Sequence, residues 1–183
     1  MRYIINFFVL TAFVCASELT EFSKLYKQDS YESYKKACQI GKHLFSKNEK
    51  DEKLLTIIGM ACLKADYIDT LGMIQSRLIF TQQARQSATI FSSVLLQKRL
   101  LIQFLQDDAD ISTLALPVIN HPICKSFVRL RDGNFTLESS KPKRVSFSDA
   151  GLKYTLYIDY AKKEKMAIDI HHKDGTIEKH RYR

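Results

Sequence analysis

The sequence has few of the residues that mark disordered or low-complexity chains. Its 183 residues include no tryptophan, three prolines and six glycines. The motifs of common enzyme classes are missing as well, since there is no GxSxG, HExxH or CxxC pattern and no phosphate-binding loop. We therefore expect an ordered chain that is not an enzyme and that needs no cofactor or resident metal.

Long apolar runs are also scarce, with one exception at the amino terminus. Arg2 precedes an almost wholly apolar run from Tyr3 to Val14, and Ala16 and Ser17 complete the pattern of a leader with its cleavage site. This run of about a dozen residues is shorter than the roughly 20 that span a bilayer. It predicts a signal peptide cleaved after Ala16 and a periplasmic or secreted protein without a stable membrane span. An uncleaved anchor and lipoprotein processing at Cys15 are the alternatives.

The basic charge of the chain belongs to its second half. Residues 17–114 contain 13 Lys and Arg against 12 Asp and Glu, whereas residues 115–183 contain 14 against 8. Charge of one sign favours partners of the other sign, which for an exported protein are acidic proteins, anionic lipid head groups or anionic envelope polymers rather than nucleic acid. A solvated face whose lysines only keep the protein soluble is the alternative.

The first half of the chain predicts paired helices. No proline occurs from Glu18 to Asp108, and apolar residues recur there every three or four positions. Short polar breaks, such as the run from Ser46 to Lys53, separate the apolar stripes. Because short connections join neighbouring antiparallel helices, this half predicts an array of helical hairpins.

Two segments of this half are similar to each other. Lys27–Tyr31 and Lys64–Tyr67 align with one residue of slippage, and each lies between two expected helices. The second copy resembles a tetratricopeptide repeat. Ile58-Gly59 stands where that repeat has Leu-Gly, Ala61-Cys62 where it has a small residue and then Tyr, and Ala65-Asp66-Tyr67 where it has Gly-Asp-Tyr.

The resemblance covers Glu18 to Phe80 and implies a helical array that binds other proteins. The sequence departs from the repeat at Thr70, where a small alanine is expected, and in lacking the closing proline. Disulfide-bridged helical repeats and a plain helical bundle are the competing interpretations. In the repeat interpretation, Gly59 allows the two helices of a pair to approach closely.

Two of the cysteines are placed for a disulfide. Cys38 lies about ten residues before the break at 48–51, and Cys62 about eleven after it. Positions equally far from a turn lie side by side in an antiparallel hairpin, so a Cys38–Cys62 bridge fits an oxidising compartment. Two buried free thiols are the alternative. Cys124 is then left over, either buried or paired with another chain.

The second half of the chain predicts strands. Leu116-Pro117 and His121-Pro122 mark a linker, after which apolar residues alternate with polar ones. A hairpin over 127–138 that turns at Asp132-Gly133 leads into expected strands at 145–147, 154–160, 166–170 and 176–182. The fold class is therefore α+β, an antiparallel helical-hairpin array followed by an antiparallel β-meander. Its divisions are 1–16 for the signal peptide, 17–114 for the helical domain, 115–125 for the linker and 126–183 for the β module.

One cluster in the second half invites a metal interpretation. Asp169 and His171 share a strand face, and His180 could lie on the neighbouring strand. Zinc sites use three or four ligands in fixed geometry, and adjacent residues such as His171 and His172 point to opposite faces, so we do not expect a metal here. A nucleophilic pair of Cys124 and His121 is conceivable, but proximity in sequence is poor evidence for such a pair, and we do not expect one.

Tyrosines near basic residues suggest a surface that stacks on sugars or holds anions. They are Tyr154, Tyr157, Tyr160 and Tyr182, and about half are expected in the core. The sequence as a whole predicts an exported, non-enzymatic adaptor that binds a protein partner through its helices. Binding of peptidoglycan or another anionic glycan by the basic β module is the alternative function.

Overall fold

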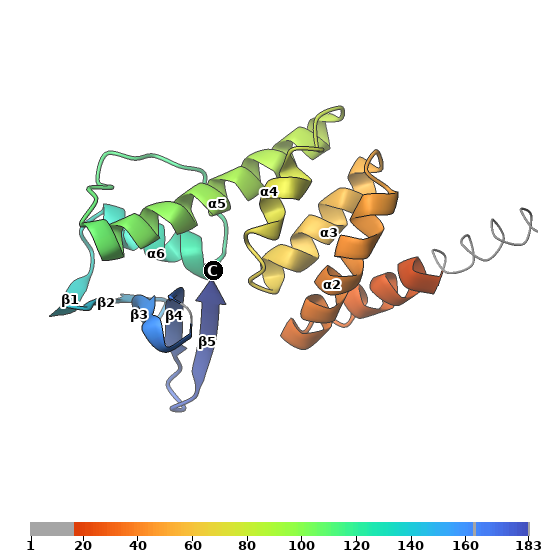
Figure 1. Cartoon of the computed structure of the whole chain (residues 1–183). Coiled ribbons are helices and arrows are strands. Elements are labelled where there is room, and N and C mark those ends of the chain that lie inside the picture. Colours follow the sequence, from red (N-terminus) through yellow and green to blue (C-terminus); the bar gives the residue numbers. More distant parts are fainter. Residues whose placement is uncertain (1–16, 163, 183) are drawn as a thin grey trace, which may run out of the picture. The chain divides into compact units, whose positions relative to one another are not determined.

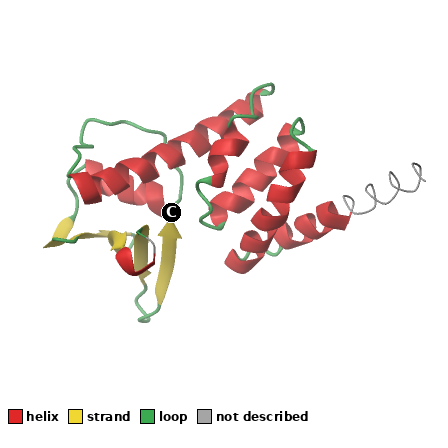
Figure 2. Ribbon diagram, in the orientation of Figure 1, coloured by secondary structure: helices red, strands yellow, loops and turns green. Residues whose placement is uncertain are grey.

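The chain divides into two compact units, and each is described by itself. The computed structural model describes residues 17–162 and 164–182; the helical unit ends at Ala88 and the sheet unit begins at Thr89. Helical hairpins precede an antiparallel β-meander, so the predicted α+β class is confirmed (Figures 1 and 2). The division lies within a helix, at a different place from the predicted linker over 115–125. The predicted signal peptide falls on 1–16, outside the described residues.

The helical unit consists of consecutive antiparallel helices with short connections. Residues 17–27 are helical, followed by α2 (Tyr31–Lys47), α3 (Glu52–Lys64), α4 (Thr70–Gln75) and the first residues of α5 (Gln82–Asp107). Local polar residues define the starts. Ser30 and Ser33 form a capping box at α2, and the Asp51 side chain accepts from the Leu54 N–H at α3. Each cap satisfies backbone donors that the first turn of a helix leaves unpaired.

The two turns that the sequence aligned share one backbone feature. Asp29 has φ 48° and Asp66 has φ 62°, both in the left-handed region where aspartate is tolerated better than most residues. At Asp66 the N–H of Tyr67 bonds to Cys62 O and the N–H of Asp66 to Leu63 O, which ends α3 in a Schellman motif. The two turns therefore share a left-handed aspartate at the aligned position.

A disulfide joins α2 and α3, which lie side by side (Figure 1). The bridge links Cys38 and Cys62, as predicted, with a Cα–Cα distance of 4.8 Å. Close contact continues one turn along, where a β-carbon on Gly41 would come within 2.7 Å of Ile58 Cγ2. Gly41 is thus a glycine that permits close approach of this pair, a role that the sequence assigned to Gly59.

The sheet unit is built on a meander in which each strand pairs with the next. In the described part of the chain the sheet has five strands, in the order β1 (Thr136–Ser140), β2 (Lys143–Asp149), β3 (Leu152–Asp159), β4 (Lys165–His171) and β5 (Ile177–Tyr182). The short helix η1 (Tyr160–Lys162) follows β3. Tight turns at Gly151 (φ 79°) and Gly175 (φ 85°) use conformations that side chains disfavour.

The predicted hairpin over 127–138 is wrong in its first strand. Pro122–Arg131 forms the helix α6, which buries Ile123, Phe127 and Leu130 on one face. Asp132-Gly133 ends this helix instead of turning a hairpin: Gly133 has φ 70°, its N–H bonds to Leu130 O, and the N–H of Asn134 bonds to Arg129 O. Pro122 stands at the first turn of α6, where a missing N–H costs nothing.

One face of the sheet forms a core with α6. The side chains of Val145, Leu156 and Ile168 are fully buried on that face. Asp149 at the end of β2 ties the helix to the sheet, because its carboxylate is 2.7 Å from Arg129 Nη2 and 3.3 Å from Lys125 Nζ. The opposite face, which we call the open face, carries Arg144, Tyr157, Asp169 and Arg181.

Candidate binding surfaces

A buried carboxylate fixes the loop between α4 and α5. Glu52 is 8 % exposed, and its two oxygens accept hydrogen bonds from three consecutive backbone N–H groups, those of Ile79 (2.5 Å), Phe80 (2.6 Å) and Thr81 (2.8 Å). Burial alone would raise the pKa of Glu52, but these hydrogen bonds outweigh it and the pKa is lowered. Glu52 is therefore held as a carboxylate around which the loop is ordered.

The carbonyl side of the same loop is fixed as well. Arg85, in the first turns of α5, donates from Nη1 to Ile79 O at 3.0 Å and to Phe80 O at 2.8 Å. The Thr81 side chain caps α5 by accepting from the Ala84 N–H at 3.1 Å. With its backbone bound on both sides, the loop cannot turn its side chains inward without breaking several hydrogen bonds.

The ordered loop presents two apolar side chains to solvent. Phe80 is 74 % exposed and Ile79 is 54 % exposed. Adjacent large apolar side chains held outward on an ordered backbone are typical of a contact with another molecule. By contrast, the crevice lined by Lys42, Phe45 and Met73 has a volume of about 20 Å³, room for about one water molecule. Of these two features of the helical unit, the exposed pair Ile79 and Phe80 is therefore the stronger candidate for a binding surface.

The open face of the sheet carries a bonded polar cluster. Tyr157 OH donates to Asp169 Oδ2 at 2.9 Å, and Arg181 Nη1 donates to Asp169 Oδ1 at 2.7 Å. Arg181 also donates to Tyr157 OH at 3.1 Å, and its Nε lies 3.5 Å from Asp159 Oδ2. Burial, and then the hydrogen bond to Asp169, raise the pKa of Tyr157. Burial would lower the pKa of Arg181, but Asp169 outweighs it and the pKa is raised.

Arg144 lies on the same open face and differs from Arg181 in its partners. Its guanidinium carbon is 4.1 Å from the centre of the Tyr157 ring, a stacked cation–π contact. Within residues 17–162 and 164–182 no carboxylate forms an ion pair with Arg144, whereas Arg181 has two. Tyr157 therefore orients two guanidinium groups, that of Arg181 in direct ion pairs with carboxylates and that of Arg144 exposed and without a direct ion pair among the described residues.

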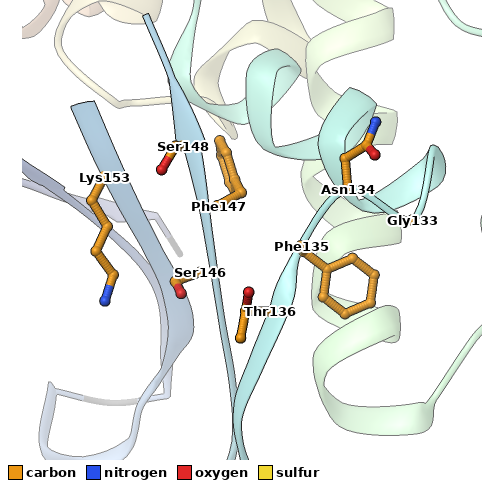
Figure 3. Close-up of a pocket in the computed structure, with 8 residues that line it drawn as sticks. All are labelled: Gly133, Asn134, Phe135, Thr136, Ser146, Phe147, Ser148 and Lys153. Atoms are coloured by element: carbon orange, nitrogen blue, oxygen red, sulfur yellow. The ribbon is translucent and has the colours of Figure 1, made fainter. Parts of the chain in front are cut away.

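A polar pocket of about 310 Å³ lies near the start of β1 (Figure 3). It is lined by the segment after α6 and by the first three strands, with Ser146, Ser148 and Lys153 among its side chains. The Lys153 Nζ is already 2.8 Å from Glu138 Oε1. The pocket therefore offers hydroxyl groups to a ligand rather than a free charge.

The tyrosines that the sequence grouped divide between the two faces. Tyr154 and Tyr182 are buried, at 3 % and 0 % exposure, while Tyr160 is 53 % exposed and Tyr157 is half-buried on the open face. The expectation that about half of them belong to the core is confirmed. Only Tyr157 and Tyr160 are available for contact with a ligand.

The sequence-based metal cluster is not brought together. Asp169 and His171 do share the open face, but His180 pairs with Ile168 and so lies on the opposite, core face. Thr155 Oγ1 is 3.3 Å from His171 Nε2, a contact with a neighbouring strand rather than with a ligand set. In the described part of the chain no three His, Cys, Asp or Glu side chains are grouped to hold a metal ion.

The Cys124–His121 pair considered from the sequence is not accessible to a substrate, because both side chains are buried. Cys124 is a free thiol with no exposed surface, and burial raises its pKa. His121 caps α6, its Nδ1 accepting from the Ile123 N–H at 3.3 Å. A raised thiol pKa disfavours the thiolate that nucleophilic chemistry requires.

Sequence patterns missed three residues of these surfaces. Glu52 reaches a loop 27 or more positions away, and no local pattern announces such a contact. Phe80 could have been noted as an apolar residue next to Ile79 in a break between helices. Arg144 on β2 lies directly opposite Tyr157 on β3, and this pairing is known only once the register of the two strands is known.

The helix α5 is relevant to the expectation that the protein has no stable membrane span. By length and composition α5 could cross a membrane, with 39 % of its most apolar window buried. A core helix of a water-soluble protein meets the same criterion, so this is weak evidence. The Cys38–Cys62 disulfide itself suits an oxidising compartment outside the cytoplasm.

No protein-family model, curated protein or solved structure matches this chain. The similarity of the helical unit to a tetratricopeptide repeat therefore stays a prediction that depends on its own residues and turns.

Proposed function

We propose that this protein is an exported adaptor whose helical unit, a tetratricopeptide-like repeat pair, binds a protein partner through the 79–81 loop. The observation that carries the proposal is the pair Ile79 and Phe80, exposed on a backbone that Glu52 and Arg85 hold in place. Contacts that are ordered before binding lose less conformational freedom on association, and exposed aromatic side chains are frequent anchors of protein interfaces.

The location in the cell is part of the proposal. The disulfide fits an oxidising compartment, and the leader pattern ending at Ala16 fits export into a periplasm or the medium. Mass spectrometry of the protein purified from its own cells tests this, because cleavage leaves Ser17 as the first residue. A protein that retains Met1 and fractionates with the cytoplasm would contradict export.

Site-specific photocrosslinking tests the contact. A photoreactive phenylalanine analogue in place of Phe80 is expected to crosslink one protein in cells, and the same analogue in place of Leu19 is not. Leu19 is the matched control because it is also an exposed apolar residue of the helical unit, at 45 %. Equal crosslinking from the two positions would contradict a specific contact at the loop.

Binding measurements with the identified partner then test the role of the loop. Phe80→Ser is expected to weaken binding at least tenfold, because loss of a central aromatic anchor commonly costs more than about 2 kcal/mol. Glu52→Gln keeps Phe80 but loosens the loop, and it is expected to weaken binding as well. Leu19→Ser should leave the affinity unchanged; unchanged affinity in Phe80→Ser would remove the loop from the interface.

A further inference from the structure

The open face of the sheet holds a cation, Arg144, that is oriented and forms no direct ion pair with a described residue; its charge also acts on Glu138, whose pKa is lowered first by Lys153 and to a smaller extent by Arg144. Arg144 stacks on the Tyr157 ring at 4.1 Å, and Tyr157 is itself fixed by its hydrogen bonds to Asp169 and Arg181. The guanidinium of Arg144 has no ion-pair partner among the described residues, although carboxylates on this face hold Arg181 and Lys153. An oriented guanidinium with free N–H groups can donate two parallel hydrogen bonds to a planar oxyanion such as a carboxylate.

Several residues near Arg144 on the open face are small and nearly covered by their neighbours. Strand register places Arg144, Tyr157, Ala167 and Arg181 in one row across β2 to β5. The next row contains Ser146 and Thr155, which are 6 % and 4 % exposed, and Ala167 has no exposed surface. These small residues are almost fully covered, so a ligand on this face would meet the larger side chains around them, Arg144 and Tyr157 among them.

The chemistry of this face fits a glycan better than a protein. Its side chains are mainly charged groups and hydroxyls, whereas the centres of protein interfaces are rich in apolar and aromatic anchors and poor in charge. The large exposed apolar residue of this face, Ile177, lies in the row of His171, two rows from Arg144. The surplus of 14 basic over 8 acidic residues in 115–183 would also draw in a polyanion.

We propose that Arg144, stacked on Tyr157, is a binding site for the carboxylate of an acidic polysaccharide. The site belongs to the sheet unit and uses none of the residues of the 79–81 loop. It is therefore independent of the proposed adaptor function, and either proposal can fail without the other.

Titration calorimetry on residues 17–183 with the disulfide formed tests the site. The probes are polygalacturonate, which carries a carboxylate on each sugar, neutral dextran, and poly-glutamate, which carries carboxylates without sugars. Polygalacturonate is expected to bind more tightly than either of the other two, and more weakly as salt is added. Arg144→Gln is expected to weaken that binding about tenfold, the loss of one charge-assisted hydrogen-bonding group.

Three variants separate recognition from net charge and from folding. Arg144→Lys keeps the charge without the planar fork and should bind with intermediate affinity, and Tyr157→Leu removes the stacking surface and should weaken binding as Arg144→Gln does. Lys24→Gln removes one exposed positive charge from the helical unit and should leave binding unchanged. Circular dichroism and melting temperature should match the parent protein for Arg144→Gln, because Arg144 is exposed.

Three results would overturn the proposal. The first is equal affinity for polygalacturonate and dextran, and the second is an Arg144→Gln affinity equal to that of the parent protein. The third is poly-glutamate binding as tight as that of polygalacturonate, which would make the ligand an acidic peptide.

Discussion

Gly41 of α2 packs directly on Ile58 of α3, so closely that a β-carbon at position 41 would come within 2.7 Å of Ile58 Cγ2 and 3.1 Å of its Cγ1. Both residues are buried, and the Cys38–Cys62 bridge lies one turn away. Ile58 is β-branched and fully buried, so it has little freedom to move aside. The distance between these two helices is therefore set by the absence of a side chain at Gly41.

The first prediction concerns this contact. Gly41→Ala should lower the free energy of unfolding of the helical unit by about 1–3 kcal/mol, the usual cost of overpacking a core, despite the higher helix propensity of alanine. Urea unfolding followed by circular dichroism measures the change. In an Ile58→Ala background the same substitution should cost less, since space is available. Equal costs in the two backgrounds would contradict a direct clash.

The second prediction concerns the disulfide. From Ser17 onward the chain contains Cys38, Cys62 and Cys124, and the bridge leaves Cys124 as the free thiol. A thiol reagent should therefore find no reactive thiol in the native protein, because Cys124 is buried, and one in the denatured protein. Cys38→Ser should raise the denatured count from one to two, whereas three thiols in the denatured parent, falling to two in the variant, would rule out the bridge.

The same bridge should contribute to stability. The cysteines are 24 positions apart, and a loop of that size stabilises the folded state by about 3 kcal/mol in the chain-entropy account. The double variant Cys38→Ser with Cys62→Ser should lose about that much in urea unfolding of the helical unit. Cys124→Ser is the matched control, and it should leave the thiol chemistry of the other two unchanged.

The third prediction concerns Asp149, which ties α6 to the sheet. The hydrogen bond from Arg129 is the largest cause that lowers the pKa of Asp149 from its ordinary 3.8; burial opposes it, and the hydrogen bond from Lys125 adds to the lowering. A carboxyl whose pKa is lowered by folding stabilises the protein above its unfolded-state pKa. That stability is lost as the pH falls below about 3.8 and through the folded pKa.

Asp149→Asn should therefore reduce the stability of the sheet unit at neutral pH by about 1 kcal/mol, a value that allows for screening by solvent. The difference between the two proteins should shrink below about pH 3.8. Urea unfolding read from amide NMR signals of the strands follows this unit alone. Asp132→Asn, which removes an exposed ion pair with the adjacent Arg131, is the control and should show a smaller difference. A difference for Asp149→Asn that does not depend on pH would contradict the account.

Local patterns were sufficient for β2 to β5 and for the bridge, because alternation and distance from a turn are properties of neighbouring residues. They failed at α6, where the apolar residues Phe127 and Leu130 before Asp132-Gly133 fit a strand and a helix end equally well. The Schellman bonds that decide between the two form only in the folded chain. Local patterns also could not decide which face of the sheet His180 lies on, because this depends on strand register. Nor could they predict that Glu52 binds the 79–81 loop, because this contact depends on long-range packing.

The last prediction concerns the phenol of Tyr157 on the open face. Burial, and then its hydrogen bond to Asp169, raise the pKa of Tyr157 above the ordinary 10.0. Asp169→Asn removes the negative charge that favours the neutral phenol, so the pKa of Tyr157 should fall. NMR titration of the tyrosine ring carbons measures each phenol separately. Tyr34 is the internal control: its pKa is also raised, by burial and by Asp29, and it should not change. If Tyr157 titrates at the same pH in both proteins, Asp169 does not hold its phenol, and the support of Tyr157 for Arg144 would then come from packing alone.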